Sequence, residues 1–405
     1  MRFSFSADLE RIHDHVLGVD RIAEISDIIA SDTDLRLEAR SKLDEFLMHM
    51  IDLEASDADF GGQGSQGAVW YRIHGAKTRS TNFDFLAKDD ATALICSILT
   101  ERQIDAITIS HNADFSYRIQ LMDKVYRFRA DAYMDMGYLA INFRFINPKP
   151  FDLQTLGFPP QILRRFDLGF EKKGLILVTG ITGSGKSTTL DAIINSNNHK
   201  NEAHIVIIGS PIEYFHSSEK CLVRHREIGR DTISFKDGSI EALRQDPDII
   251  VIGEMRDPET IMTALEITDS GHKVFSTLHT GSAVESVHRI VAECPTNEQN
   301  RVRMRLADTL SVVISQKLVP SVDGRRVLAK EILSVTPWVS AAIINSNIGE
   351  IYQMINEGKE HGMITLEQDL MRLLVTKQIT KETAISHANS KKRLMELMSY
   401  YKRKM

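Results

Sequence analysis

The sequence predicts an α/β protein of two domains, in which an N-terminal α+β domain precedes a larger domain built on a mainly parallel sheet. Residues 115–146 alternate between apolar and polar side chains, as antiparallel strands do, and they follow a helical pattern over residues 1–50. Further along, short apolar runs alternate with helical stretches, which is typical of a parallel sheet covered on both faces. These runs span residues 174–179, 204–208, 249–253 and 273–277.

The first domain is expected to cover residues 1–146. After the N-terminal helices, a glycine-rich turn at 61–65 precedes a strand at 69–73, and a helix is expected at 91–99. Antiparallel strands then fill the remainder. This order of helices and strands predicts an α+β domain with its helices on one face of an antiparallel sheet.

The second domain is expected to follow a linker. Pro148 and Pro150 interrupt regular structure, so we place the linker at 147–157. The strand–helix–strand pattern predicts a core at 158–297, and the pattern of residues 298–405 indicates a helical C-terminal region.

Composition narrows the class of protein. The net charge of −6 argues against direct binding of nucleic acid, although a local basic patch stays open. The three cysteines are widely spaced and indicate neither a disulfide framework nor a zinc cluster. The N-terminus lacks the apolar core of a signal peptide, and no apolar run approaches the roughly 20 residues that span a bilayer. We therefore expect a cytoplasmic protein.

The stretch Gly180-Ile181-Thr182-Gly183-Ser184-Gly185-Lys186-Ser187 fits the phosphate-binding pattern G-x-x-x-x-G-K-[ST] at every defined position. Glycines let the backbone N–H groups turn toward phosphate oxygens at a helix N-terminus. Lys186 would reach the β- and γ-phosphates, and the Ser187 hydroxyl would ligate Mg²⁺. The alternative is a glycine-rich turn that binds nothing. The expected nucleotide-binding residues are Gly180, Thr182, Gly183, Ser184, Gly185, Lys186, Ser187 and Thr188, with Ser187 also the expected metal ligand.

Hydrolysis also needs a carboxylate that can polarise water. Glu254 follows an apolar strand, at the strand end where ligands of open α/β sheets bind, although Gly253 stands where an aspartate is usual. A salt bridge to Arg256 is the alternative role for Glu254. Glu213 ends another apolar strand and could assist, or could be a surface residue. His279 ends a third strand and could sense the γ-phosphate, or could be structural.

Taken together, these segments resemble the secretion ATPase superfamily, whose members are the PilT/GspE-like motors of type II secretion, type IV pili and type IV secretion. The resemblance rests on the phosphate loop and on five further segments in the order and spacing of the family. They are Ser-Pro-Ile-Glu-Tyr at 210–214, Arg-His-Arg-Glu-Ile-Gly at 224–229, Asp-Pro-Asp-x₅-Glu-Met-Arg-Asp at 246–257, Ser-Thr-Leu-His-Thr-Gly-Ser-Ala at 276–283, and Gly-Met-Ile-Thr-Leu-Glu-Gln at 362–368. The resemblance implies a PAS-like first domain and a RecA-like second domain.

The resemblance also implies roles for particular residues. Glu254 becomes the catalytic carboxylate, Glu213 the acid of the family's aspartate box, and His279 the residue of its histidine box. Arginines of the first domain are implied to stabilise transition-state charge, as arginine fingers do. The segments that resemble the family's arginine strands carry Arg127, Arg129 and Arg144. Simple solubility of an edge strand is the alternative for these arginines.

Three departures from the family pattern point away from pilus motors. Gly209 and Ser210 replace an acidic pair, the late A-I-R-N-L-I segment is not legible around 341–345, and the four-cysteine zinc insertion of the assembly motors is missing. By analogy, the sequence favours the DotB/TraJ-like motors of type IVB secretion and conjugation.

We therefore expect a Mg²⁺-dependent ATPase that works as a homohexamer and powers a membrane-embedded secretion or conjugation apparatus through domain motion. The expected location is the cytoplasm, with peripheral attachment to the inner membrane left open. The alternatives are a pilus assembly or retraction motor, a DNA-translocating ATPase and a non-catalytic scaffold that binds ATP. A GTP-dependent switch is disfavoured, because no guanine-reading N-K-x-D segment appears.

Overall fold

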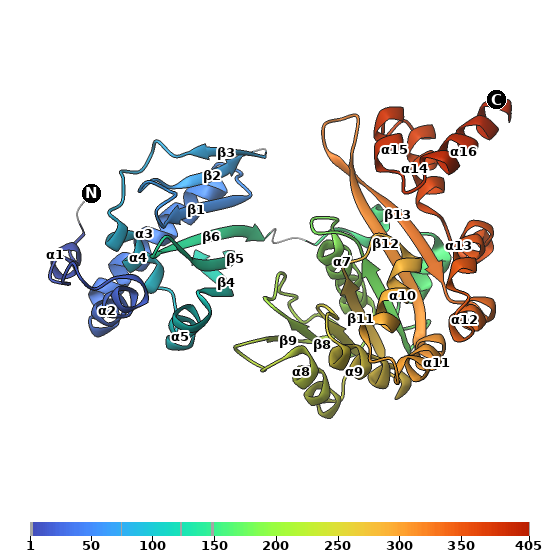
Figure 1. Ribbon diagram of the computed structural model, residues 1–405, viewed down its shortest axis with the longest axis horizontal. Helices are drawn as coiled ribbons and strands as arrows, with labels where there is room; N and C mark the ends of the chain where they lie inside the picture. The colour runs from blue at the N-terminus through green and yellow to red at the C-terminus, as the bar shows by residue number, and fades with distance from the viewer. Residues whose placement is uncertain (1–2, 74, 122–123, 147–149, 405) are drawn as a thin grey trace. The chain divides into compact units, whose positions relative to one another are not determined.

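The computed structural model describes residues 3–73, 75–121, 124–146 and 150–404. The chain divides into two compact units, Met1–Pro148 and Lys149–Met405, which are drawn in Figure 1 and described separately below. Of the expected linker at 147–157, residues 147–149 lie outside the described residues. The rest begins the second unit and includes the short 3₁₀ helix η1 (Leu153–Leu156).

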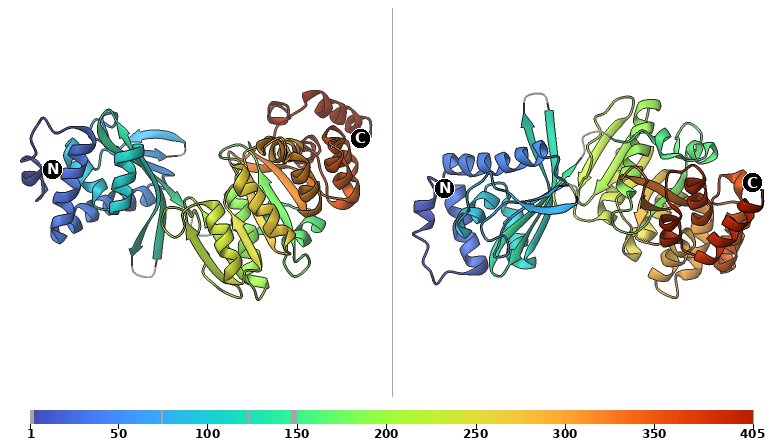
Figure 2. Two further views of the ribbon diagram at one scale, coloured as in Figure 1. Left: turned by 60° about the horizontal axis from the view of Figure 1, so that its bottom comes forward. Right: turned by 90° about the horizontal axis from the view of Figure 1, so that it is seen from above.

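The first unit is an antiparallel sheet with its helices gathered on one face, as Figure 2 shows. The strand order is β3-β2-β1-β6-β5-β4. The strands are β1 (Asp57–Gly61), β2 (Trp70–Ile73), β3 (Ala76–Arg79), β4 (Asn112–Leu121), β5 (Lys124–Asp135) and β6 (Tyr138–Ile146). The helices are α1 (Ser6–Leu9), α2 (Gly18–Ser31), α3 (Thr33–Asp52), α4 (Lys88–Cys96) and α5 (Glu101–Ser110). The α+β prediction for this part of the chain is confirmed.

The core of the first unit explains why the alternation in sequence was informative. On β4, Phe115, Tyr117 and Ile119 are buried, while the residues between them are exposed or half-buried. Strand β1 was not predicted, because Asp57 and Asp59 interrupt any apolar pattern. Asp57 is nevertheless buried, since arginines of the neighbouring strands pair with its carboxylate.

The second unit is a seven-stranded sheet in the order β13-β12-β7-β11-β10-β8-β9, parallel except for β13. Its strands are β7 (Gly174–Thr179), β8 (His204–Gly209), β9 (Leu222–Glu227), β10 (Ile249–Ile252), β11 (Lys273–Leu278), β12 (Leu310–Pro320) and β13 (Arg326–Ser334). The four predicted strands are confirmed as β7, β8, β10 and β11. Their side chains are almost all buried, as expected for a parallel sheet covered on both faces.

Helices cover both faces of this sheet and extend beyond it at the C-terminus. They are α6 (Pro160–Phe166), α7 (Lys186–Lys200), α8 (Phe235–Ala242), η2 (Leu243–Gln245), α9 (Pro258–Asp269), α10 (Ala283–Glu293), α11 (Gln299–Thr309), α12 (Pro337–Ile344), α13 (Ile348–Glu357), η3 (Lys359–His361), α14 (Leu366–Val375), α15 (Lys381–His387) and α16 (Lys391–Lys404). Among the described residues, none of these helices is long and apolar enough to cross a bilayer.

The expectation that residues 298–405 are helical is wrong for β12 and β13. Strand β12 pairs in parallel with β7 and is buried over most of its length, so its apolar residues show no clear alternation. A short apolar run of this kind does not distinguish a buried strand from a buried helix. A turn signal was present at Asp323-Gly324, where Gly324 has a φ of +81° between the two strands.

Candidate active site

Loops from distant parts of the sequence meet at one edge of the second unit's sheet. Strands β7, β11, β10 and β8 are consecutive neighbours and run parallel, so the loops that follow them leave from the same edge. These loops carry Gly180, His279, Glu254 and Glu213, respectively. The sheet order therefore gathers the acids and the histidine predicted from sequence around the phosphate loop.

The phosphate loop has the backbone that its glycines allow. Gly180, Gly183 and Gly185 have φ values of +148°, +77° and +86°. A Cβ atom at Gly180 would lie 2.5 Å from the carbonyl oxygen of Gln316, so no other residue fits there. Gly185 caps the N-terminus of α7, which opens with Lys186 and Ser187. The loop thus presents a helix N-terminus, where backbone N–H groups attract anions.

Lys186 places a buried positive charge in this loop. Its Nζ donates to the carbonyl oxygens of Gly180, at 2.9 Å, and of Ile181, at 3.2 Å. Burial lowers the pKa of Lys186, while the negative charges of Glu213 and Glu254 raise it. Both predicted carboxylates therefore act on the ammonium group that would bind phosphate.

Glu254 lies between two basic side chains. Its Oε2 is 2.8 Å from Arg256 Nε and 3.9 Å from His279 Nε2. The segment is fixed from β11, because the Thr277 hydroxyl donates to the carbonyl of Gly253 at 2.6 Å. The salt bridge to Arg256, which was the alternative role for Glu254, is thus present beside the contact with His279.

His279 is held in its neutral form by its surroundings. Burial lowers its pKa, and the positive charges of Lys186, Arg256 and Arg289 lower it further. Arg289 also donates to the His279 carbonyl at 2.8 Å. A neutral imidazole at this position can donate or accept a hydrogen bond at neutral pH.

Other predicted residues differ in their exposure. Ser187 is half-buried on the first turn of α7, and Thr182 and Thr188 are exposed. Ser184 Oγ is buried and has no hydrogen-bond partner among the described residues. Ser187 and Ser184 therefore bring hydroxyl groups to the phosphate loop beside its backbone.

The three predicted arginines belong to the first unit. Arg129 Nε donates to Asp114 Oδ1 at 3.1 Å, between β5 and β4. Arg144 Nε donates at 2.9 Å to Asp57 Oδ1, on the residue directly opposite it on β1. Arg127 is half-buried on β5. Within this unit, Arg129 and Arg144 each neutralise a neighbouring carboxylate.

Gln316 supports the phosphate loop and was not predicted. Its side chain, on β12, is buried, with the residue 1% exposed. Its Nε2 donates to the Ser184 carbonyl at 3.0 Å, and its Oε1 accepts from the Thr189 hydroxyl at 3.1 Å. A glutamine inside an apolar run, such as Val-Val-Ile-Ser-Gln-Lys-Leu-Val at 312–319, was the available signal.

A second support is a chain of buried hydroxyl groups. Ser286 Oγ lies 2.6 Å from Thr280 Oγ1 and donates to Thr179 Oγ1 at 3.3 Å. This chain connects the end of β7, directly before the phosphate loop, to the loop that carries His279. The two loops are therefore coupled by hydrogen bonds that sequence patterns do not reveal.

The donor set fits a magnesium ion that is bound mainly through nucleotide phosphates. Among the described residues, no three His, Cys, Asp or Glu side chains are grouped so that they could enclose a metal ion. Mg²⁺ commonly binds one or two protein oxygens, substrate phosphates and water. The hydroxyl of Ser187, at the N-terminus of α7, is suited to that role.

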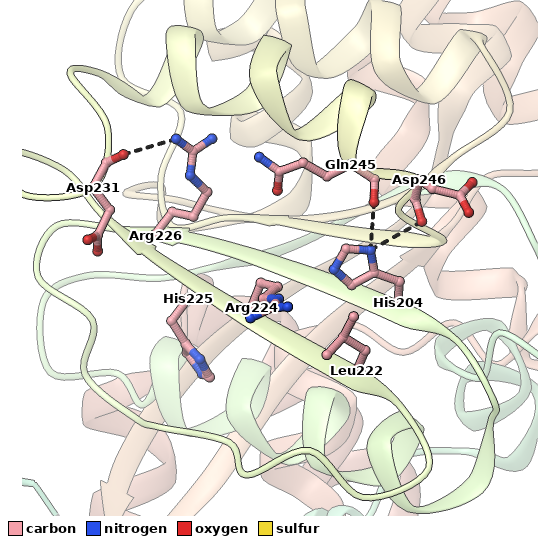
Figure 3. Close-up of a pocket in the computed structure, with 8 residues that line it drawn as sticks. All are labelled: His204, Leu222, Arg224, His225, Arg226, Asp231, Gln245 and Asp246. Carbon is pink, nitrogen blue, oxygen red and sulfur yellow. Dashed lines mark hydrogen bonds between the residues drawn. The ribbon is translucent and has the colours of Figure 1, made fainter.

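A separate cavity of about 670 Å³ lies beside strands β8 and β9 (Figure 3). Arg224 and Arg226 of β9 line it, and the His204 ring turns its Nδ1 toward the carbonyl oxygens of Gln245 and Asp246. Its lining residues include none of the predicted site residues. This cavity therefore does not coincide with the predicted nucleotide site.

Comparisons with known proteins identify relatives of this chain. A family model described as type II/IV secretion system protein matches residues 36–400. The type IV pilus retraction ATPase PilT of Pseudomonas aeruginosa is 40% identical over 306 residues, which cover 76% of this chain and 87% of that protein.

Solved structures show the same fold. The crystal structure of the pilus retraction motor PilT with bound ADP matches with a TM-score of 0.78 and 36% identity, over 87% of this chain and 98% of that chain. The X-ray structure of the Legionella pneumophila ATPase DotB matches with a TM-score of 0.70 and 27% identity, over 86% of this chain and 96% of that chain. The predicted fold class and the predicted superfamily are confirmed.

Replacing Gln316 by leucine should weaken nucleotide binding. The buried Ser184 carbonyl and Thr189 hydroxyl would lose their partner, and leaving such groups unpaired costs about 1–3 kcal/mol. We expect the Kd for ADP, measured by titration with a fluorescent analogue, to rise roughly 5- to 150-fold. Gln353→Leu, at an exposed glutamine of α13, is the control and should leave the Kd unchanged. An unchanged Kd for Gln316→Leu would contradict the supporting role.

Proposed function

Because the chain belongs to the type II/IV secretion system protein family and is a P-loop ATPase, we propose that it is a motor ATPase of the pilus-retraction kind. The observation that carries the proposal is the 40% identity to PilT over 306 residues, together with the match to the PilT structure. This revises the preference for DotB/TraJ-like motors. That preference rested on three local departures from the family pattern, namely Gly209-Ser210, the segment around 341–345 and the missing zinc insertion, whereas the similarity to PilT covers 76% of the chain.

In the proposed reaction, Lys186 binds the γ-phosphate of ATP. Its ammonium would exchange the loop carbonyls for phosphate oxygens, while the N–H groups of the loop and of the α7 N-terminus bind the β-phosphate. Thr182, Ser184 and Thr188 are proposed as further contacts. Mg²⁺, held by Ser187 and the phosphates, would neutralise charge on the nucleotide.

We assign the water-activating role to Glu254. Its negative charge acts on Lys186 and its Oε2 lies 3.9 Å from His279 Nε2, so a water between it and the γ-phosphate would meet a base on one side and positive charge on the other. Glu213 would assist by orienting the same water. Neutral His279 would hydrogen-bond the γ-phosphate or the water and so report whether that phosphate is present.

Arg127, Arg129 and Arg144 are proposed to stabilise the transition state from the first unit. Arg129 and Arg144 would first have to leave Asp114 and Asp57. The Arg129–Asp114 pair is partly exposed, and such pairs typically contribute only about 0–1 kcal/mol, so its exchange for a phosphate partner is energetically accessible. The buried Asp57 would keep Arg72 as a partner when Arg144 leaves. Domain motion would then couple this exchange to the presence of ATP.

The biological setting is part of the proposal. We propose a homohexamer in the cytoplasm, at the inner-membrane face of a pilus machine. DNA translocation is not favoured by the acidic net charge. Type IVB secretion is the second candidate, supported by the match to DotB at a TM-score of 0.70.

The chemistry is tested by two substitutions with different expected effects. Lys186→Ala should abolish nucleotide binding and turnover, because it removes the charge that binds phosphate. Glu254→Gln should lower kcat about 100-fold or more, as expected for loss of a general base, while the Kd for ADP stays within about threefold. Phosphate release and ADP titration on the purified protein measure both quantities.

The matched control is Glu259→Gln, at a glutamate that is 68% exposed and paired with Lys236 on the surface. It should retain wild-type turnover. Substantial turnover by Lys186→Ala or Glu254→Gln would refute the assignment.

The choice between pili and secretion is tested in the native host. Deleting the gene should increase the number of surface pili and stop their retraction, because a retraction motor removes pilus subunits. Fluorescent labelling of pili in living cells would follow both effects, with Lys186→Ala as a catalytically inactive complement. Normal retraction together with loss of protein or DNA export would support the secretion candidate instead.

A further inference from the structure

The loop that carries Glu213 is attached to the edge of the sheet. We call residues 210–217, which follow β8, the acid loop. The backbone N–H of Ile212 donates to Glu227 Oε2 at 3.1 Å, and that of His216 donates to His225 Nε2 at 3.1 Å. Both acceptors belong to β9, and Figure 3 shows His225 on the opposite side of that strand from Arg226. Since β9 is the edge strand, these bonds attach the acid loop to the periphery of the unit.

A buried pair ties the same loop to the helix of the phosphate loop. His216 Nε2 lies 3.2 Å from Asp191 Oδ1 on α7. The His216 side chain is 0% exposed and that of Asp191 is 21% exposed. Asp191 stands four residues after Ser187, so both lie on the same face of the helix that presents the phosphate-binding residues.

The protonation of this pair follows from its contacts. His216 Nδ1 is buried and has no hydrogen-bond partner among the described residues. An unpaired lone pair is less costly there than an unpaired N–H group, so we place the ring proton on Nε2, where it is donated to Asp191. Burial raises the pKa of Asp191 above its ordinary value, and the hydrogen bond from His216 offsets part of that rise.

We propose that Asp191 and His216 are positioning residues that set the location of Glu213 relative to the phosphate loop. Glu213 precedes His216 by three residues, and its charge acts on Lys186. The pair therefore joins the two elements whose separation decides whether that carboxylate faces the γ-phosphate. This inference rests on the role proposed above for Glu213.

A second hydrogen bond joins α7 to the acid loop and would still hold the loop if the Asp191–His216 bond were lost. Asn198, further along α7, donates from its Nδ2 to the carbonyl of Ser217 at 2.8 Å. Asn198 lies near the C-terminal end of α7, and Ser217 follows Glu213 by four residues in the acid loop. Loss of the Asp191–His216 bond should therefore shift Glu213 without detaching the loop or unfolding the unit.

Steady-state kinetics on the purified full chain tests the proposal. Asp191→Ala should lower kcat about 10- to 100-fold, with KM for ATP, Kd for ADP and the thermal unfolding temperature close to wild type. Asp191→Asn keeps an oxygen that accepts from Nε2 and should return kcat to within about threefold of wild type. A merely structural role would lower the unfolding temperature and leave the kcat of the folded protein unchanged, which would overturn the proposal.

The control uses a similar histidine–carboxylate pair that also joins α7 to the segment after β8. His199 Nε2 lies 3.1 Å from Glu219 Oε1, but these side chains are 49% and 50% exposed. Because exposed pairs contribute little, Glu219→Gln should leave kcat unchanged. A decrease as large as that of Asp191→Ala would show that any contact in this region matters, and would overturn a specific role for the buried pair.

A double-mutant cycle tests whether the pair acts through Glu213. In a Glu213→Gln background, Asp191→Ala should lower kcat by less than about threefold, because the carboxylate to be positioned is already absent. If the kcat loss of the double variant equals the product of the two single-variant losses, the residues act independently and the proposal is overturned. A wild-type protein without ATP turnover would refute the proposed function itself, whereas normal turnover in Asp191→Ala would refute only the positioning role.

Discussion

The buried ammonium group of Lys186 is the interaction on which the site depends. Its backbone partners, Gly180 and Ile181, hold it inside the phosphate loop, and the charges of Glu213 and Glu254 favour its protonated form. A buried charge of this kind is stable only with such compensation. Phosphate oxygens would supply the same compensation more strongly, so bound ATP would replace the loop carbonyls as the partner of this ammonium group.

The sheet order explains how so few residues build this site. Neighbouring parallel strands deliver their C-terminal loops to one edge, and buried polar residues then fix the loops against one another. Gln316 holds the phosphate loop from β12, and Ser286 connects that loop to the loop that carries His279. Asp191 connects α7 to the acid loop. Each link is a hydrogen bond between elements that are far apart in sequence.

The sequence predicted the parts of the structure that depend on local pattern. Strands β7, β8, β10 and β11 are uninterrupted apolar runs, and the phosphate loop has a fixed spacing of glycines. Strand β12 was missed because its apolar run fits a buried helix equally well, and only pairing with β7 decides between them. Gln316 and the Asp191–His216 pair were missed for a related reason. Their roles arise from contacts across the fold, and no local spacing marks them.

We propose that Glu213 and Glu254 form one hydrolytic site with Lys186. Quenched-flow measurement of γ-phosphate cleavage in Glu213→Gln, saturated with ATP, tests it most directly. Removing a negative charge beside the phosphates should leave ATP affinity equal or higher, whereas loss of water orientation should slow cleavage at least about tenfold. Cleavage at the wild-type rate, or a loss of affinity alone, would show that Glu213 is not part of the hydrolytic site.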